Sequence, residues 1–307
     1  MKKFAGSTAM IIATIFWGVA FSAQSAGMDH IKPMLFTALR SLVGAAALVI
    51  VMMLFDLWRE KRLTVWGAAK TSAERRTLLT GGIFCGVIIT FASGLQQAGL
   101  QYTSAGKTGF LTALYIIIVP LLGLFFKRKA TILLYIAAVM ALAGTYLLCG
   151  GVSSIGTGEY LVMACALVYS FHVLVIDRYA PRCDCVRLSC IQFVIATVLS
   201  AIISLILREP WIFNAIKESL VYWVFCGVCS SALAFTLQMV AQKYLHPVTA
   251  TLLMSLESVF AVLGGWLFLN EMLSAREFAG CAVILLAVII AQLPCPFFSP
   301  KKSGFTP

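Results

Sequence analysis

Ten apolar runs occupy most of the chain, and each is long enough to cross a lipid bilayer. Because a helix needs about 20 apolar residues to span the hydrocarbon core, runs of this length predict transmembrane helices. The expected spans are 7–26, 33–55, 78–99, 104–126, 131–149, 158–176, 187–207, 219–241, 247–269 and 276–293. The sequence therefore predicts an all-α integral membrane protein of ten transmembrane helices with no sizeable soluble domain.

The composition agrees with this prediction and excludes several classes of protein. Hydrophobic residues make up 61% of the chain and charged residues only 11%, whereas about a quarter of an ordinary soluble domain is charged. These values exclude a disordered chain, a nucleic-acid-binding module and most soluble enzymes. The ten cysteines are scattered, mostly within apolar runs, so we expect them to pack as small apolar residues rather than form a disulfide framework.

The first apolar run resembles a secretory signal peptide, because Lys2 and Lys3 precede it. Its apolar stretch is longer than a typical signal core, and its removal would destroy an internal repeat of the chain. We interpret this run as the first span.

The distribution of basic residues predicts the orientation of the spans. With the N-terminus in the cytoplasm, the cytoplasmic segments hold 17 of the 23 lysines and arginines. The outer segments hold Lys32, Arg208, Lys217 and Arg276. This bias follows the positive-inside rule and predicts that both termini lie on the cytoplasmic side of the cell membrane. The net charge of +11 then reflects orientation in a lipid bilayer and not a nucleic-acid partner.

The chain also repeats itself. At an offset of 142 residues, Ala92, Leu95, Gln96, Tyr102 and Leu111 match Ala234, Leu237, Gln238, Tyr244 and Leu253. At an offset of 152, Trp17 aligns with Tyr169 and Arg40 with Gln192. Since each half has five spans, the second half enters the membrane from the opposite side, an inverted-topology repeat typical of secondary transporters. Chance matching between two apolar sequences is the alternative, but glutamine is costly inside a span, so the aligned Gln96 and Gln238 argue against it.

Polar side chains recur along spans 3, 4, 8 and 9. They stand three or four residues apart, so each set forms one stripe of a helix. We expect these stripes to face a substrate cavity between the two halves, although interhelical hydrogen bonding is the alternative for any single serine or threonine. The candidate substrate-binding residues are Trp17, Phe21, Arg40, Gln96, Lys107, Tyr115, Tyr169, His172, Gln192, Gln238 and Glu257.

The ionisable candidates have distinct expected roles. Arg40 offers a guanidinium fork that suits a carboxylate or phosphate, or it joins two helices by hydrogen bonds. Glu257 lies midway through span 9 and is the best candidate for a proton site or for binding a substrate amine. His172 could relay protons or be simply hydrogen-bonded. Lys107 lies near the outer end of span 4, where extension of its side chain toward the membrane surface is the simpler interpretation.

The order and spacing of several short motifs suggest a family. The first half contains Trp17-Gly18 followed by Phe21, PMLFTALR at 33–40, YTSAGKTGFLTALY at 102–115 and VPLLG at 119–123. The second half contains GEYL at 158–161, HVLVIDR at 172–178, SLESVFA at 255–261 and then Asn270-Glu271. With these motifs the chain resembles the EamA-type transporters of the drug/metabolite transporter superfamily, as two tandem five-helix modules at 5–149 and 156–293.

This resemblance implies a ten-helix carrier with a central cavity between the modules, and family members move amino acids, other metabolites or drugs, often outward. The family usually has a proline after the glutamate of span 9. Ser258 stands there in this chain, which puts a proline-induced break of span 9 in doubt.

The sequence thus predicts a secondary carrier that exports amino acids or similar small metabolites by alternating access, with proton coupling as a hypothesis based on Glu257 and His172. No cofactor, metal or catalytic residue is expected, and the chain has no motif of a membrane enzyme. A facilitative carrier or exchanger for another solute or drug is the alternative within transport. A non-transporting membrane sensor or scaffold is the alternative outside it. Either a monomer or a homodimer is compatible with the sequence.

Overall fold

The computed structural model describes residues 2–61, 63–67, 69–125, 132–148, 155–245, 250 and 253–292. These residues are almost all helical, and none of them belongs to a strand. The helices of the first half are α1 (Lys2–Gly27), α2 (Pro33–Glu60), α3 (Ser72–Leu100), α4 (Ala105–Thr112), α5 (Tyr115–Phe125) and α6 (Ile132–Leu148). Those of the second half are α7 (Thr157–Tyr179), the short η2 (Ala180–Arg182), α8 (Cys185–Ile206), α9 (Phe213–Glu218), α10 (Leu220–Phe225), η3 (Cys226–Ala234), α11 (Phe235–Tyr244), α13 (Leu256–Leu269) and α14 (Ala275–Gln292). The all-α class is confirmed.

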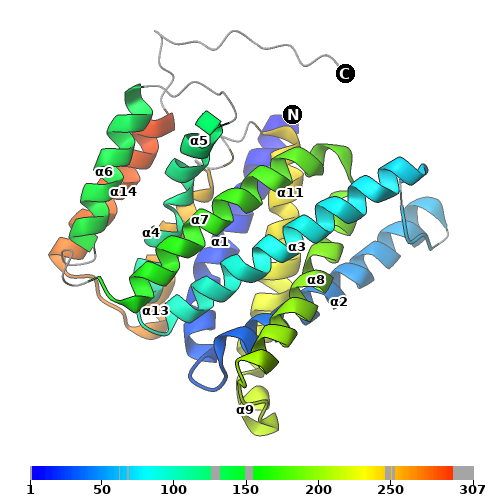
Figure 1. Ribbon diagram of the computed structural model, residues 1–307, viewed down its shortest axis with the longest axis horizontal. Coiled ribbons are helices and arrows are strands. Elements are labelled where there is room, and N and C mark those ends of the chain that lie inside the picture. Colours follow the sequence, from blue (N-terminus) through cyan, green and yellow to red (C-terminus); the bar gives the residue numbers. More distant parts are fainter. Residues whose placement is uncertain are drawn as a thin grey trace.

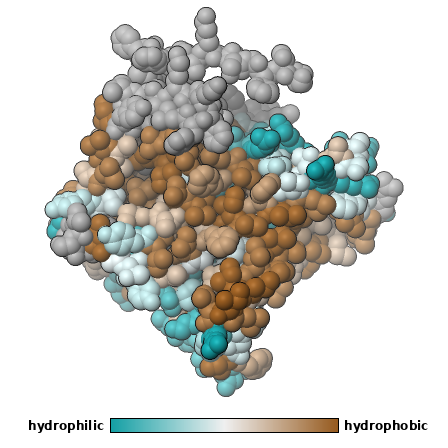
Figure 2. Space-filling view, in the orientation of Figure 1, coloured by the Kyte–Doolittle hydropathy of each residue, from teal (hydrophilic) through white to brown (hydrophobic). Residues whose placement is uncertain are grey.

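Seven helical segments in the described part of the chain are long and apolar enough to cross a membrane, and two further apolar helices are shorter. Large apolar side chains are exposed on the outside of many helices, including Leu54, Leu142, Ile206 and Leu267. Figure 2 shows hydrophobic side chains across the middle of one face, with hydrophilic ones gathered toward the bottom and the upper right. A bilayer would cover such a surface, so the protein is a multi-pass membrane protein. The count of ten spans stays a prediction, and the basic residues at 127–129 and 301–302 lie outside the described residues.

Helices from the two halves pack against one another in corresponding pairs. The second helices of the halves, α2 and α8, pack together, and so do the last ones, α6 and α14, which lie side by side at one flank of the molecule (Figure 1). The α3 helix packs against α7, while α1 packs against η3 and α11. The two halves therefore pack into one bundle, and the largest hydrophobic core cluster contains residues of both.

Two carboxylates fix the ends of the α2–α8 pair. At the start of α2, the Glu209 carboxylate accepts hydrogen bonds from the backbone N–H groups of Met34 (3.1 Å) and Leu35 (2.7 Å). At its other end, both carboxylate oxygens of Asp56 accept from Arg187 Nη2 at 2.7 Å, and one of them also accepts from the Thr64 N–H at 2.9 Å and the Thr64 hydroxyl at 3.0 Å. Satisfying the free N–H groups of a helix and pairing buried charges both stabilise a fixed geometry. These contacts hold α2, and with it Arg40, in a defined position.

Glycines bring α2 and η3 into close contact beside Arg40. A methyl group at Gly44 would lie 2.8 Å from Ser231 Cβ, and one at Gly227 would lie 2.8 Å from the backbone oxygen of Arg40. Only glycine fits so near a neighbouring backbone, which is a common way for membrane helices to pack. The close approach places Arg40 next to the π-helical turns of η3, which span Cys226–Ala234.

Two predicted spans are interrupted in the middle. The run 104–126 was expected as one span, but it divides into α4 and α5 at Ala113–Leu114, where the N–H of Leu114 bonds the Leu111 oxygen at 3.3 Å in a tighter turn. In the second half a turn at Ser255 precedes α13. Ser255 lies 142 residues after Ala113, so the two interruptions occupy aligned positions of the repeat. The doubt about span 9 is thereby resolved, because the helix is interrupted three residues before Ser258 without a proline.

Candidate functional site

A cavity with about 450 Å³ of free space lies in the middle of the bundle, where α1, α2, α3, α4, α5, α7, η3, α11 and α13 converge. Its fourteen lining residues are Trp17, Phe21, Gln24, Arg40, Gln96, Thr112, Tyr115, Tyr169, Val173, Ser230, Phe235, Gln238, Met254 and Glu257. All fourteen are buried, so the cavity lies deep within the helical bundle. A buried cavity that combines aromatic walls with a few convergent polar groups is the usual form of a small-molecule site.

Arg40 carries the positive charge of the cavity. It is 4% exposed, and its Nη1 donates to the side-chain oxygen of Gln24 at 2.9 Å. Its Nε finds no hydrogen-bond partner, and Arg40 forms no ion pair with any described residue. A buried guanidinium bound only to a neutral amide retains free donors, so Arg40 is suited to receive an anionic group.

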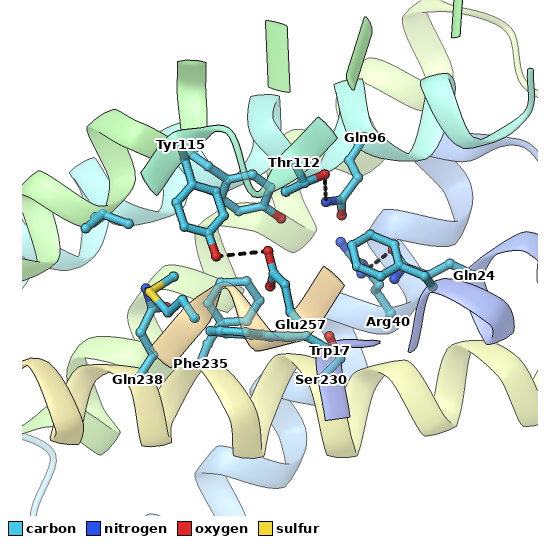
Figure 3. A pocket seen from close by; sticks show the side chains of 14 residues that line it. Trp17, Gln24, Arg40, Gln96, Thr112, Tyr115, Ser230, Phe235, Gln238 and Glu257 are labelled. Atoms are coloured by element: carbon cyan, nitrogen blue, oxygen red, sulfur yellow. Dashed lines mark hydrogen bonds between the residues drawn. The ribbon is translucent and has the colours of Figure 1, made fainter. Parts of the chain in front are cut away.

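Glu257 is the acidic residue of the cavity, and Figure 3 shows its carboxyl group next to the Tyr115 hydroxyl and apart from Arg40. Its carboxylate is 5% exposed and accepts a hydrogen bond from the Tyr115 hydroxyl at 2.9 Å. Within the described residues it has no cationic partner, and in particular it does not pair with Arg40. The cavity therefore contains one basic and one acidic side chain that do not pair with each other.

The two halves contribute matching contacts to the cavity. Gln96 donates to the Thr112 hydroxyl at 3.1 Å, and its repeat counterpart Gln238 lies 3.8 Å from the sulfur of Met254. Met254 follows Thr112 by 142 residues. Tyr115 and Glu257, which bond one another, are separated by the same 142 residues.

The aromatic walls match in the same way. The Tyr169 hydroxyl lies 3.3 Å from Ser93 Oγ, while the Trp17 and Phe235 rings meet edge to face with centroids 4.9 Å apart. Trp17 aligns with Tyr169 at the offset of 152, and Ser93 aligns with Phe235 at the offset of 142. Each half thus pairs its first helix with the third span of the other half at the cavity wall.

The helix interruptions aim side chains into the cavity. Thr112 and Tyr115 lie on either side of the break between α4 and α5, and Glu257 lies two residues after the turn at Ser255. Broken helices at membrane depth are tolerated where they are buried in protein or line a cavity. Since Thr112 and Tyr115 are three residues apart, one span supplies both a hydroxyl and a phenol to the same space.

Eight of the eleven residues predicted from the sequence line this cavity: Trp17, Phe21, Arg40, Gln96, Tyr115, Tyr169, Gln238 and Glu257. His172 and Gln192 lie behind the wall, fully buried, with His172 Nε2 and Gln192 Oε1 2.8 Å apart. The His172 ring packs edge to face against Phe235 with centroids 5.8 Å apart, so it supports the wall instead of facing the free space. Lys107 lies outside the cavity and pairs with Glu277 at 2.7 Å.

The sequence analysis did not select six of the lining residues, which are Gln24, Thr112, Val173, Ser230, Phe235 and Met254. The repeat offset could have identified Phe235 and Met254 as the counterparts of Ser93 and Thr112. Gln24 was detectable as a glutamine inside a span. Within the described residues no group of three or more His, Cys, Asp or Glu side chains could hold a metal ion.

A family model described as the EamA-like transporter family matches residues 4–150 and again residues 156–292. The chain belongs to the EamA-like transporter family. An uncharacterized transporter of Archaeoglobus fulgidus is 24% identical over 95% of this chain and 87% of its own length. The uncharacterized transporter YoaV of Bacillus subtilis is 22% identical, over 92% of this chain and 94% of its own. The chloroplastic WAT1-related protein At3g02690 of Arabidopsis thaliana is 23% identical over 94% of this chain and 69% of its own.

A solved crystal structure is similar in fold, with a TM-score of 0.66 over 93% of this chain and 96% of that chain, at 20% sequence identity. The match shows that the helical arrangement recurs in another protein. The family and the relatives named as transporters show that the chain is a membrane transporter.

Proposed function

We propose that this transporter is a secondary carrier for a zwitterionic small metabolite, such as an amino acid, which binds between Arg40 and Glu257. One observation carries the proposal: a buried guanidinium and a buried carboxyl group line the same central cavity without pairing with each other. An unpaired buried charge is costly, so each of these groups favours a ligand of opposite charge. The carboxylate of an amino acid would pair with Arg40 and its ammonium group with Glu257.

The pairing favours a zwitterion over a simple anion or a simple amine. A simple anion would pair with Arg40 and leave Glu257 without an ionic partner. A simple amine would pair with Glu257 and leave Arg40 without one. A zwitterion has no net charge to carry into the membrane interior and compensates both groups at once. Gln24, Gln96 and Gln238 add hydrogen-bonding groups around it, and the rings of Trp17 and Phe235 supply apolar contact area.

Alternating access is the mechanism we propose, with residues 5–149 and 156–293 as two inverted halves that rock around the cavity. The two matches of the family model, the paired packing of corresponding helices and the aligned contacts in the cavity support this arrangement. The full proposal has ten spans, with both termini on the cytoplasmic side of the cell membrane. Outward transport rests on the family resemblance alone.

Proton coupling would run through Glu257. The same carboxylate can hold either a proton or a substrate ammonium group, and this competition would exchange one for the other across the membrane. His172, the second proton candidate, is separated from the free space by the cavity wall, so Glu257 is the group we propose. The Tyr115 hydroxyl bonded to Glu257 would orient the carboxylate in both states.

A thermal-stability screen of the purified protein tests the proposed ligand class. Ligand binding to the native state raises the unfolding temperature in proportion to the logarithm of ligand concentration over Kd. We expect stabilisation by some amino acids and none by their decarboxylated or deaminated analogues. Arg40→Met and Glu257→Gln should abolish the shift, whereas Lys107→Met, which removes a charge outside the cavity, should keep it. Equal stabilisation by an analogue that has lost one charge would refute the two-charge site.

A further inference from the structure

A second hollow lies on the side of the bundle and shares no residue with the central cavity. It contains about 1060 Å³ of open space between the start of α2, the second half of α3 and the end of α8. Its walls are mainly apolar and include Phe91, Leu95 and Ala98 of α3 together with Ile203 and Leu207 of α8. Since these helices are membrane spans with exposed apolar neighbours, this groove faces lipid.

Two basic residues stand at one end of the groove. Lys32 precedes α2, Arg208 follows α8, and both side chains are exposed. Neither forms an ion pair with another described residue. The one acidic residue of the lining, Glu209, is engaged by the Met34 and Leu35 N–H groups and by Ser204 Oγ at 2.7 Å. This end of the groove therefore has two free cations, while its carboxylate is already occupied by donors.

Trp211 indicates the depth of these cations in the membrane. It is 45% exposed, and its ring N–H donates to Ser204 Oγ at 3.1 Å. Tryptophans with an exposed ring and a satisfied N–H concentrate at the level of the lipid headgroups. Arg208 lies three residues before Trp211, so the cationic end of the groove is at headgroup level.

The length of the groove matches one lipid leaflet. Along α3 its lining runs from Gln101 to Thr90. At 1.5 Å per residue this distance is about 16 Å, close to half of the roughly 30 Å hydrocarbon thickness of a bilayer. The groove thus leads from headgroup level to about the middle of the membrane, which is the course of an acyl chain.

We propose that this groove binds an anionic phospholipid, with its phosphate held by Lys32 and Arg208 and one acyl chain lying along α3 between Phe91 and Ala98. Charge complementarity selects the headgroup, because a zwitterionic lipid would bring a cation of its own to the same two basic groups. The site is independent of the transported substrate. It would fill the space between α2, α3 and α8 and support the packing of α2 from the lipid side.

Native mass spectrometry of the detergent-purified protein tests this site, with phosphatidylglycerol and phosphatidylcholine of identical acyl chains as probes. We expect the native chain to retain phosphatidylglycerol at least about tenfold better, since each basic group near the surface contributes attraction to an anionic lipid. The double variant Lys32→Ala with Arg208→Ala should lose this preference. The matched control, Lys217→Ala with Arg276→Ala, changes the net charge equally at basic residues outside the groove lining and should keep it.

Two further measurements distinguish binding of the whole lipid from binding of its headgroup alone and from general effects of charge. Ala98→Trp, which fills the groove, should weaken retention of both lipids while the thermal unfolding in detergent stays cooperative. Glycerol 1-phosphate at the same concentration should not displace phosphatidylglycerol. Equal retention of both lipids by the native chain, equal loss in the control pair, or full displacement by glycerol 1-phosphate would each overturn the proposal.

Discussion

Replacing Gly18 with alanine should separate two neighbouring helices that both line the cavity. Gly18 lies on α1 between Trp17 and Phe21 and contacts the backbone of α13, the helix of Glu257. A methyl group there would overlap the Phe260 Cβ atom and lie 2.7 Å from the Phe260 carbonyl carbon and 2.9 Å from the Ala261 nitrogen. Backbone atoms cannot rotate away, so α1 and α13 must move apart by several tenths of an ångström or more.

The expected effect is larger than the intrinsic gain from alanine. Glycine to alanine within a helix stabilises by roughly 0.5–1 kcal/mol, whereas overpacking a tight contact costs about 1–3 kcal/mol. We therefore expect Gly18→Ala to destabilise the protein by about 1–2 kcal/mol net and to weaken substrate binding, because Trp17 and Glu257 move relative to one another. Thermal unfolding in detergent and ligand-induced stabilisation measure the two effects.

Gly6→Ala is the matched control on the same helix. A methyl group at Gly6 would lie 3.3 Å from Leu245 Cγ and no closer than 3.5 Å to any backbone atom, so only a side chain has to give way slightly. This variant should be neutral or gain up to about 1 kcal/mol, with binding unchanged. The reasoning fails if Gly18→Ala is as stable as Gly6→Ala and binds substrate as the native chain does.

Three further substitutions test other parts of the account. Arg187→Ala leaves Asp56 buried without its partner and should destabilise the protein by about 3–5 kcal/mol, measured by thermal unfolding; a loss below about 1 kcal/mol would show that the cluster is not structural. Lys107→Met removes a part-exposed ion pair outside the cavity, so stability should change by less than about 1 kcal/mol and the substrate Kd should not change. Tyr115→Phe removes a hydrogen bond to Glu257 and should raise the Kd by about tenfold or more; an unaltered Kd would detach this phenol from the site.

The sequence alone identified much of the candidate site because polar residues are conspicuous in an apolar chain. Arg40, Gln96, Gln238 and Glu257 are expensive inside a membrane and therefore signal a function or a partner. All four line the cavity. At the offset of 142 residues Tyr115 also aligns with Glu257 in the sequence. In the structure these two side chains form a direct hydrogen bond.

Other features depended on tertiary contacts that periodicity does not contain. Lys107 and His172 have the same chemistry as true site residues, but an ion pair with Glu277 and a hydrogen bond with Gln192 engage them elsewhere. The break at Ala113–Leu114 interrupts an apolar run that reads as one continuous span. Phe235 was missed because an aromatic residue is common in a membrane helix, and its place in the wall follows from its edge-to-face contacts with Trp17, His172 and Phe193.

Counterflow in proteoliposomes tests the central claim, that a zwitterion is carried between Arg40 and Glu257, most directly. Vesicles preloaded with the amino acid found to stabilise the protein are diluted into its labelled form, and accumulation of label is measured. We expect accumulation by the native chain and by Lys107→Met, and none by Arg40→Met. Glu257→Gln should also abolish it, because the ammonium group loses its partner. Undiminished counterflow in both cavity variants would contradict the account.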